Sequence, residues 1–379
     1  ILDATQANWL DAPPAKHVEQ AHALNQSIGA QFANGQISPQ GQRVLGLGIE
    51  PRLGAMILHD PAPNMQALAC VIAALLSERD IARDPAFASQ SLGIDLLDRV
   101  RLVLAASRTD KATGTLYQVL QLAQRWYRAV RATEQSSNDP RLTLQSSLDQ
   151  VTDIEHRVAR LCAAAFADRI AKRRDPDGQK HGKNQVSGNN IGFTLANGRG
   201  VSMFDDEPLA QSPWCVVVDC DGQNTDGRVY LAVSITLAII HELPQVNSRN
   251  TYRYAPESNK LIARKQTCIG QLVLQETPIK NIPEADRLQC FTDVIKAQGL
   301  GFLAWDKQCE NWLHRVSWLA QLCPNELPLV SHETLLDTLD EWLLPYCANI
   351  KSIGQLQAFI LKPVSVSYTH LTLPTKRIV

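Results

Sequence analysis

The sequence predicts an α+β multidomain protein. Apolar residues follow helical spacing in its first half, alternate like strands from about residue 190, and return to helical spacing after residue 284. We expect a winged-helix-like segment and a helical bundle, then a small OB-like β-barrel, then a helical C-terminal domain. The expected ranges, in that order, are 1–60, 61–175, 185–280 and 281–363.

The composition is that of a folded protein with two or three domains. Of its 379 residues, 45% are hydrophobic and 20% are charged, and the formal net charge is -1. This net charge excludes attraction of the whole molecule to nucleic acid, so any anion-binding surface must be a local patch. No apolar run approaches the roughly 18 residues of a membrane span. We therefore expect no membrane partner.

The nine cysteines do not follow a disulfide or zinc pattern. Their number is odd and none of them forms a CxxC pair. Several lie inside apolar helical patterns. We expect reduced, buried thiols in a cytoplasmic protein, and no metal site.

The first 60 residues show the order helix, hairpin, helix, which is winged-helix-like. A helix is expected after the Pro13-Pro14 pair, since proline is tolerated in a first helical turn, and it ends at Gly29. Asn34-Gly35 favours a tight hairpin turn. A second short helix begins at Ser38-Pro39.

The centre of the predicted bundle is the segment 68–80. It is apolar almost all round, with polar residues only from Ser77 onward, and a helix without a polar face is buried on most sides. Short polar connections between helices favour a bundle. Further helices are predicted at 92–104, 116–130 and 154–165.

Short strands separated by Gly and Asp turns predict the barrel. The expected strands are 191–195, 214–218, 229–239, 251–254, 260–264 and 272–275. OB-folds hold single strands with basic and aromatic residues, although each aromatic is more often a core residue. The available residues are Phe193, Arg199, Tyr230, Tyr252 and Tyr254.

Beyond residue 284 we expect helices before Gly299, at 305–322 and at 333–344, with the tryptophans in their core.

The main concentration of charge is the segment 157–183, with eight Lys or Arg against three Asp. One interpretation is a solvated helix end with a loop. The other is a strip that contacts phosphates, because Lys and Arg release counterions from a nucleic-acid backbone. The candidate nucleic-acid-binding residues are Arg169, Lys172, Arg173, Arg174, Lys183 and Arg199.

Several motifs occur in an order that resembles HrpB-type DEAH-box ATP-dependent RNA helicases. They are Pro51-Arg52-Leu53, the Ser77-Glu78-Arg79-Asp80 end of the apolar helix, Asp168-Arg169-Ile170-Ala171, and Trp-rich pieces at 303–305 and 341–346. The resemblance covers about residues 1–362. It implies the C-terminal accessory half of such a helicase, with a winged-helix-like domain, a "ratchet" bundle, a β-domain and an HrpB-specific C-terminal domain. The implied partner is single-stranded RNA, possibly DNA.

No motor motif is present in these 379 residues. A helicase needs a phosphate-cradling GxxxxGK[ST] loop, and the nearest segment, 178–184, has the wrong glycine spacing and Asn in place of Ser or Thr. We identify no catalytic residue and no cofactor in this chain. The resemblance implies that ATP and Mg²⁺ bind RecA-like lobes expected upstream of Ile1.

The last residues, 364–379, are expected to be a non-native tail, because Ser367-Tyr368-Thr369-His370-Leu371 and the residues after it resemble translated sequencing adaptor.

A competing hypothesis is a stand-alone nucleic-acid-binding or scaffold protein with no motor. The reading frame upstream of Ile1 discriminates between the two, because only the helicase requires a GxxxxGK[ST] loop there.

Overall fold

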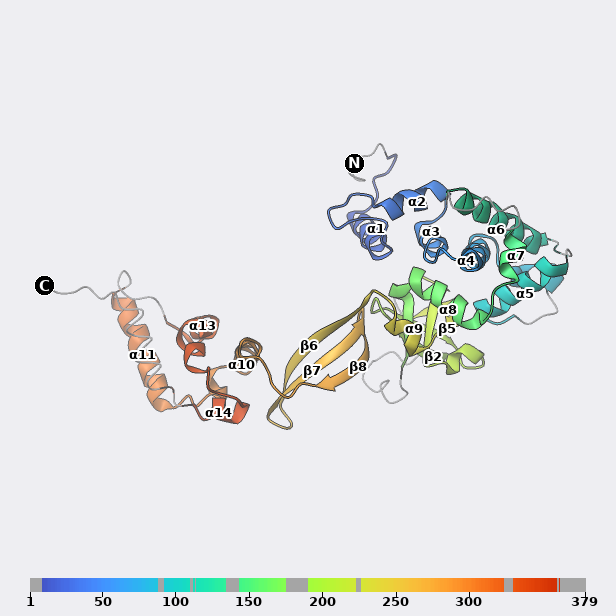
Figure 1. Ribbon diagram of the computed structural model, residues 1–379. Helices are drawn as coiled ribbons and strands as arrows, with labels where there is room; N and C mark the ends of the chain where they lie inside the picture. Colours follow the sequence, from blue (N-terminus) through green and yellow to red (C-terminus); the bar gives the residue numbers. More distant parts are fainter. Residues whose placement is uncertain are drawn as a thin grey trace. The chain divides into compact units, whose positions relative to one another are not determined.

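The computed structural model describes residues 9–87, 92–109, 112, 114–133, 143–174, 190–222, 226–323, 330–359 and 361. The chain divides into two compact units, Ile1–Asn247 with Cys268–Leu274, and Ser248–Thr267 with Gln275–Val379. The first unit contains helices and a small barrel. Figure 1 shows the helices and strands of the chain, coloured along the sequence. The predicted tail at 364–379 lies outside the described residues.

The helix, hairpin and helix predicted at the start of the chain are present. α1 (Ala15–Ser27) follows Pro14, and α2 (Pro39–Leu47) is capped by the Ser38 hydroxyl, which accepts from the Gly41 amide. The hairpin is a single antiparallel bridge between Gln31 and Ile37. α3 (Pro51–Ile57) follows and is buried from Arg52 onward.

The bundle is built around α4 (Pro63–Ser77), whose residues 65–75 are all buried, as predicted. α5 (Leu96–Thr109), α6 (Gly114–Thr133), α7 (Leu144–Leu148) and α8 (Ile154–Ala165) complete it. The predicted helix at 92–104 began too early. The Asp95 carboxylate accepts from the Leu97 amide, so this residue caps α5 and Leu92 lies outside the helix.

A closed five-stranded barrel follows the bundle. Its strands are β1 (Ile170–Arg173), β2 (Asn190–Leu195), β3 (Gly200–Phe204), β4 (Trp214–Cys220) and β5 (Gly227–Ser234). They are ordered β1-β2-β3-β5-β4, and pairing of β1 with β4 closes the ring. β3 and β5 run parallel, and the other pairs are antiparallel.

The barrel begins earlier and ends earlier than expected. Residues up to 175 were assigned to the bundle, but buried Ile170 and Ala171 belong to β1. The predicted long strand 229–239 stops at Ser234, because Thr236 caps the short helix α9 (Leu237–His241). The bundle is therefore joined directly to the barrel between Ala165 and Ile170.

The last three predicted strands do not belong to the barrel. β6 (Val246–Ala255), β7 (Lys260–Ile269) and β8 (Leu272–Pro278) form a separate sheet in the order β6-β7-β8. A closed barrel has no free edge to which further strands can be added. Tyr252 and Tyr254 lie on β6, so the prediction that they flank the barrel groove was wrong.

Residues 214–218 of β4 and 231–233 of β5 are apolar on both faces because they separate two cores. Cys215, Val217 and Val229 pack inside the barrel. Val216 and Leu231 point the other way and pack in the same core as the bundle helices. This double burial explains the continuous apolar runs at 214–218 and 231–233.

The second unit contains α10 (Glu284–Gln298), α11 (Lys307–Leu322), α12 (His332–Asp337), α13 (Leu339–Trp342) and α14 (Ile353–Gln357). The predicted helix 333–344 breaks at Thr338, whose hydroxyl donates to the Thr334 carbonyl at 2.8 Å, a bond that bends helices. The expectation of core tryptophans is confirmed for Trp342, whose indole N–H donates to Leu335, but Trp318 is 62% exposed.

One ion pair joins α3 to the bundle–barrel junction. The Arg52 guanidinium holds the Asp168 carboxylate through two hydrogen bonds of 2.6 and 2.9 Å and donates to the Ala165 carbonyl at 3.1 Å. It also lies over the Phe166 ring, 5.3 Å from its centroid. The Arg52 side chain is 9% exposed and that of Asp168 is 37% exposed, so water screens the pair only partly.

No described helix is both long and apolar enough to cross a membrane. All nine cysteines are free thiols, as predicted, and seven are buried. Burial raises the pKa of the Cys162 and Cys215 thiols to about 12, with the Asp95 charge adding to the effect at Cys162.

We predict that Arg52→Ala lowers the free energy of unfolding by about 2–4 kcal/mol, because it leaves a partly buried carboxylate without its partner. Urea unfolding followed by circular dichroism measures this loss. The control is Arg101→Ala, which removes an exposed pair with Glu155 and should change stability by less than about 0.5 kcal/mol. Equal losses in both variants would contradict the structural role of Arg52.

We predict that a maleimide at neutral pH modifies Cys323 first, because that thiol is exposed whereas Cys162 and Cys215 are buried and protonated. Mass spectrometry of time points identifies the modified residue, and Cys323→Ser should remove the fast phase. Early modification of Cys162 in the folded protein would contradict this part of the fold.

Candidate nucleic-acid interface

The structure places five of the six predicted basic residues around the start of the barrel. Arg169 ends the short helix η4 (Ala167–Arg169), and Arg174 follows β1. Lys172 and Arg173 lie on β1 itself. Arg199 lies in the turn between β2 and β3. Lys183 lies outside the described residues.

Two of these residues are engaged inside the fold. Arg169 donates to the Val218 carbonyl at 2.8 Å. Its guanidinium carbon also lies over the Phe166 ring, 5.5 Å from the ring centroid. Arg174 holds the Asp226 carboxylate through two bonds of 2.7 and 2.8 Å. Arg174 also donates to the Thr194 hydroxyl. Both guanidinium groups therefore have a clear structural role.

Lys172 and Arg173 are the better candidates for phosphate contact. Lys172 is exposed, and its ammonium lies 5.4 Å from the centroid of the Trp214 ring. Arg173 is half-buried and donates to the Gln211 side chain at 3.3 Å. Among the residues that the structure describes, no carboxylate forms an ion pair with either. Their positive charges are therefore not neutralised by a described neighbour.

The predicted groove residues separate into two groups. Phe193 is fully buried in the barrel core, so it is not a stacking surface. Arg199 is exposed and donates weakly to the Asp221 carbonyl at 3.5 Å. Tyr230, on β5, is 46% exposed. Of the predicted aromatics on the barrel, Tyr230 is therefore the one that a ligand can reach.

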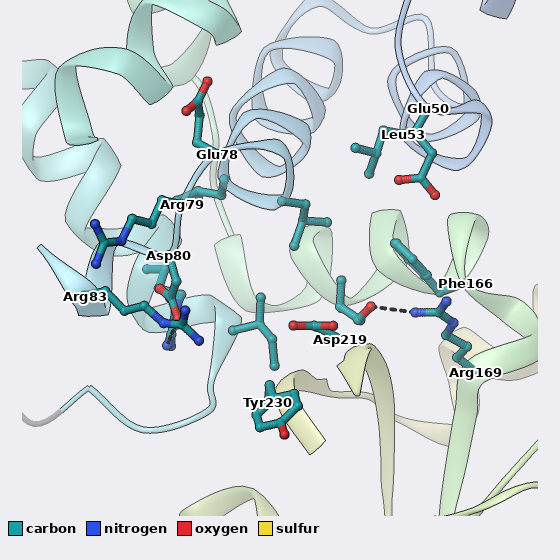
Figure 2. A pocket seen from close by; sticks show the side chains of 15 residues that line it. Glu50, Leu53, Glu78, Arg79, Asp80, Arg83, Phe166, Arg169, Asp219 and Tyr230 are labelled. Atoms are coloured by element: carbon teal, nitrogen blue, oxygen red, sulfur yellow. Dashed lines mark hydrogen bonds and ion pairs between the residues drawn. The ribbon is translucent and has the colours of Figure 1, made fainter. Parts of the chain in front are cut away.

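A cleft of about 420 Å³ lies between the bundle and the barrel within the first unit. Figure 2 shows Arg79 and Arg83 on one side, Arg169 on the other, and Tyr230 below them. Carboxylates of Glu50, Glu78, Asp80 and Asp219 also line it. The lining of the cleft thus carries charges of both signs and is not uniformly basic.

Asp80 forms an ion pair with Arg99, whose guanidinium donates to each of the two carboxylate oxygens at 2.9 Å. Burial disfavours ionisation of Asp80, but the bonds from Arg99 and the Ala82 amide outweigh it, so the pKa of Asp80 lies below its usual value. Within the described ranges, Arg79 and Arg83 have no ion-pair partner at salt-bridge distance. Arg79 and Arg83 are therefore the two cations on this side of the cleft that can bind an anionic ligand.

Arg79 and Arg83 are not among the binding residues predicted from the sequence. Arg79 was noted only as part of the Ser-Glu-Arg-Asp motif, and neither arginine lies in the basic run 157–183. Arg79 follows α4 (Pro63–Ser77) and Arg83 ends the short helix η2 (Ile81–Arg83), and nothing in the sequence shows that the barrel lies opposite them.

In the described part of the chain, no group of three or more His, Cys, Asp or Glu residues is arranged to hold a metal ion.

No family model matches the chain. Over 361 residues, which are 94% of this chain, it is 29% identical to the ATP-dependent RNA helicase HrpB of Escherichia coli (strain K12) and covers 38% of that protein. It is also similar to the crystal structure of the E. coli DExH-box NTPase HrpB, with a TM-score of 0.57 and 25% identity. That match covers 97% of this chain and 40% of the other.

A second crystal structure, of the Escherichia coli DEAH/RHA helicase HrpB, shows the same fold at a TM-score of 0.57 and 24% identity. The chain spans about two fifths of the length of the relatives that it matches. The order of motifs found in the sequence and both comparisons agree: the chain is similar to the HrpB-type helicases over nearly all of its own length.

Proposed function

We propose that this chain is the accessory part of an ATP-dependent RNA helicase and that it grips single-stranded RNA beside the motor. The observation that carries this proposal is the similarity to an ATP-dependent RNA helicase over 94% of the chain. The accessory role follows from the missing GxxxxGK[ST] loop, because a motor requires that loop to hold nucleotide phosphates.

The geometry supports a gripping role for the barrel. We assign the five-stranded ring to the OB class, whose strands 2 and 3 and adjoining loops bind oligonucleotides. Lys172 and Arg173 extend from its first strand without described carboxylate partners. Cations of this kind bind a phosphate backbone without reading its sequence. The grip is therefore electrostatic and tolerant of sequence.

In the intact protein we propose that RecA-like lobes bind ATP and Mg²⁺ and supply the movement. The matched relatives are about two and a half times as long as this chain, which leaves room for such lobes. The bundle and the barrel are joined directly and share a hydrophobic core, so we propose that they move as one rigid part relative to those lobes. A single strand is then held on this body while the lobes move.

We predict that Lys172→Gln with Arg173→Gln weakens binding of a single-stranded RNA and lowers the slope of log affinity against log salt by about 1.4, because each phosphate contact on a single strand contributes about 0.7. Fluorescence anisotropy at several salt concentrations measures this slope. The stability of this double variant should not change, since both side chains lie outside the described ion pairs.

Arg174→Gln is the matched comparison. It removes the partner of Asp226, so it should lower the free energy of unfolding by about 1–3 kcal/mol and leave the salt slope of the folded protein unchanged. An unchanged slope in the Lys172/Arg173 variant, with a reduced slope for Arg174→Gln, would show that the structural and binding roles are assigned the wrong way round.

We predict that the purified chain does not hydrolyse ATP, whereas a longer protein containing the upstream reading frame does so with RNA stimulation. A coupled phosphate-release assay measures both proteins. Turnover by the chain alone would contradict the accessory role. RNA binding by a complete gene product without an upstream phosphate loop would favour the stand-alone binding protein instead.

A further inference from the structure

We propose that Phe204, Arg228 and Tyr230 form a platform on the barrel that stacks the bases of a single strand. This stacking platform deepens the proposed function, on which it rests, by assigning base contacts to a surface outside the basic run 157–183. We assign the phosphates of the bound RNA to Arg79 and Arg83, which line the cleft between the bundle and the barrel.

The strand register puts these three side chains on the outside of the barrel. β3 and β5 run parallel, with Ser202 opposite Arg228. Met203 and Val229 point into the barrel core, so their immediate neighbours on each strand point to the other face. After Tyr230 the pairing of β5 with β4 is irregular, which lets Leu231 face outward as well. Phe204, Arg228 and Tyr230 therefore point outward from two neighbouring strands.

Both rings are exposed to solvent. Phe204 is 43% exposed and Tyr230 is 46% exposed, although folding normally hides most of an aromatic side chain. The Arg228 guanidinium carbon lies over both rings, 4.3 Å from the Phe204 centroid and 6.0 Å from the Tyr230 centroid. This cation holds the rings as an ordered surface, since cations are attracted to aromatic faces.

Arg228 keeps hydrogen-bond donors available for a ligand. It is exposed, and no carboxylate in the described part of the chain forms an ion pair with it. A guanidinium has five N–H donors and also stacks on flat rings. Aromatic rings beside an unpaired guanidinium match a nucleotide, which presents a flat base next to an anionic phosphate. This charge complementarity is the reason for assigning the occupant.

The platform continues into the cleft between barrel and bundle. Tyr230 lines that cleft together with Arg79 and Arg83, as Figure 2 shows. Glu78 and Asp219 line it as well and repel phosphate. Phosphates should therefore follow the two arginines, while bases lie on the rings. Bases in a duplex are stacked inside and are not available, so the ligand is single-stranded.

The test uses the full chain and a fluorescent single-stranded RNA of about ten nucleotides. We expect Phe204→Ala and Tyr230→Ala each to weaken binding about 5- to 150-fold, the range given by a stacked base, without a change in salt slope. Tyr230→Phe retains the ring and should bind like the wild type. Tyr117→Ala removes an equally exposed tyrosine from α6 and should have no effect.

Arg79→Gln with Arg83→Gln should instead lower the salt slope by about 1.4, because these residues contact phosphates. Circular dichroism of each variant confirms that the fold is kept. A change of slope in the aromatic variants, or none in this arginine pair, would overturn the assignment of bases and phosphates.

An abasic RNA of the same length identifies the base contact directly. It should bind the wild type weakly, and Tyr230→Ala should not weaken its binding further, because the contact is already lost. Wild-type binding that is insensitive to Phe204→Ala and Tyr230→Ala overturns the platform and leaves the proposed function standing. Failure of the wild type to bind any single-stranded RNA overturns the proposed function itself.

Discussion

The Arg52–Asp168 ion pair fixes the place where three parts of the first unit meet. Arg52 lies on α3, and Asp168 lies between the last bundle helix and the first barrel strand. Phe166 lies beneath two guanidinium groups at the same point, those of Arg52 and Arg169. Two motifs that carry the family resemblance, separated by 116 residues, are thus one structural contact.

The same principle applies to the other charged motif residues. Asp80 is held by Arg99 and Asp226 by Arg174, each through two hydrogen bonds. A bidentate arginine fixes the geometry of its partner carboxylate, and the Asp80–Arg99 pair lines the cleft. We propose that RNA binding is carried by basic residues outside these pairs, among them Lys172, Arg173, Arg79, Arg83 and Arg228.

The sequence predicted the helices well because their periodicity is local, and α4 is apolar all round as its buried position requires. The prediction from the sequence was wrong where strand pairing between distant segments decides which strands belong to the barrel. Closure of β1 on β4 excludes the later strands, and no local pattern shows this. A run of basic residues likewise does not reveal which of them have a distant carboxylate partner, as Arg174 has in Asp226.

The central claim is that a single strand lies on the barrel face beside the bundle. Ultraviolet crosslinking of 4-thiouridine RNA to the full chain, followed by peptide mass spectrometry, tests it most directly. The account predicts crosslinks in β3 and β5, at Phe204 and Tyr230, with others near β1. Efficient crosslinks confined to the Trp-rich helices after residue 284, with none on the barrel, would contradict it.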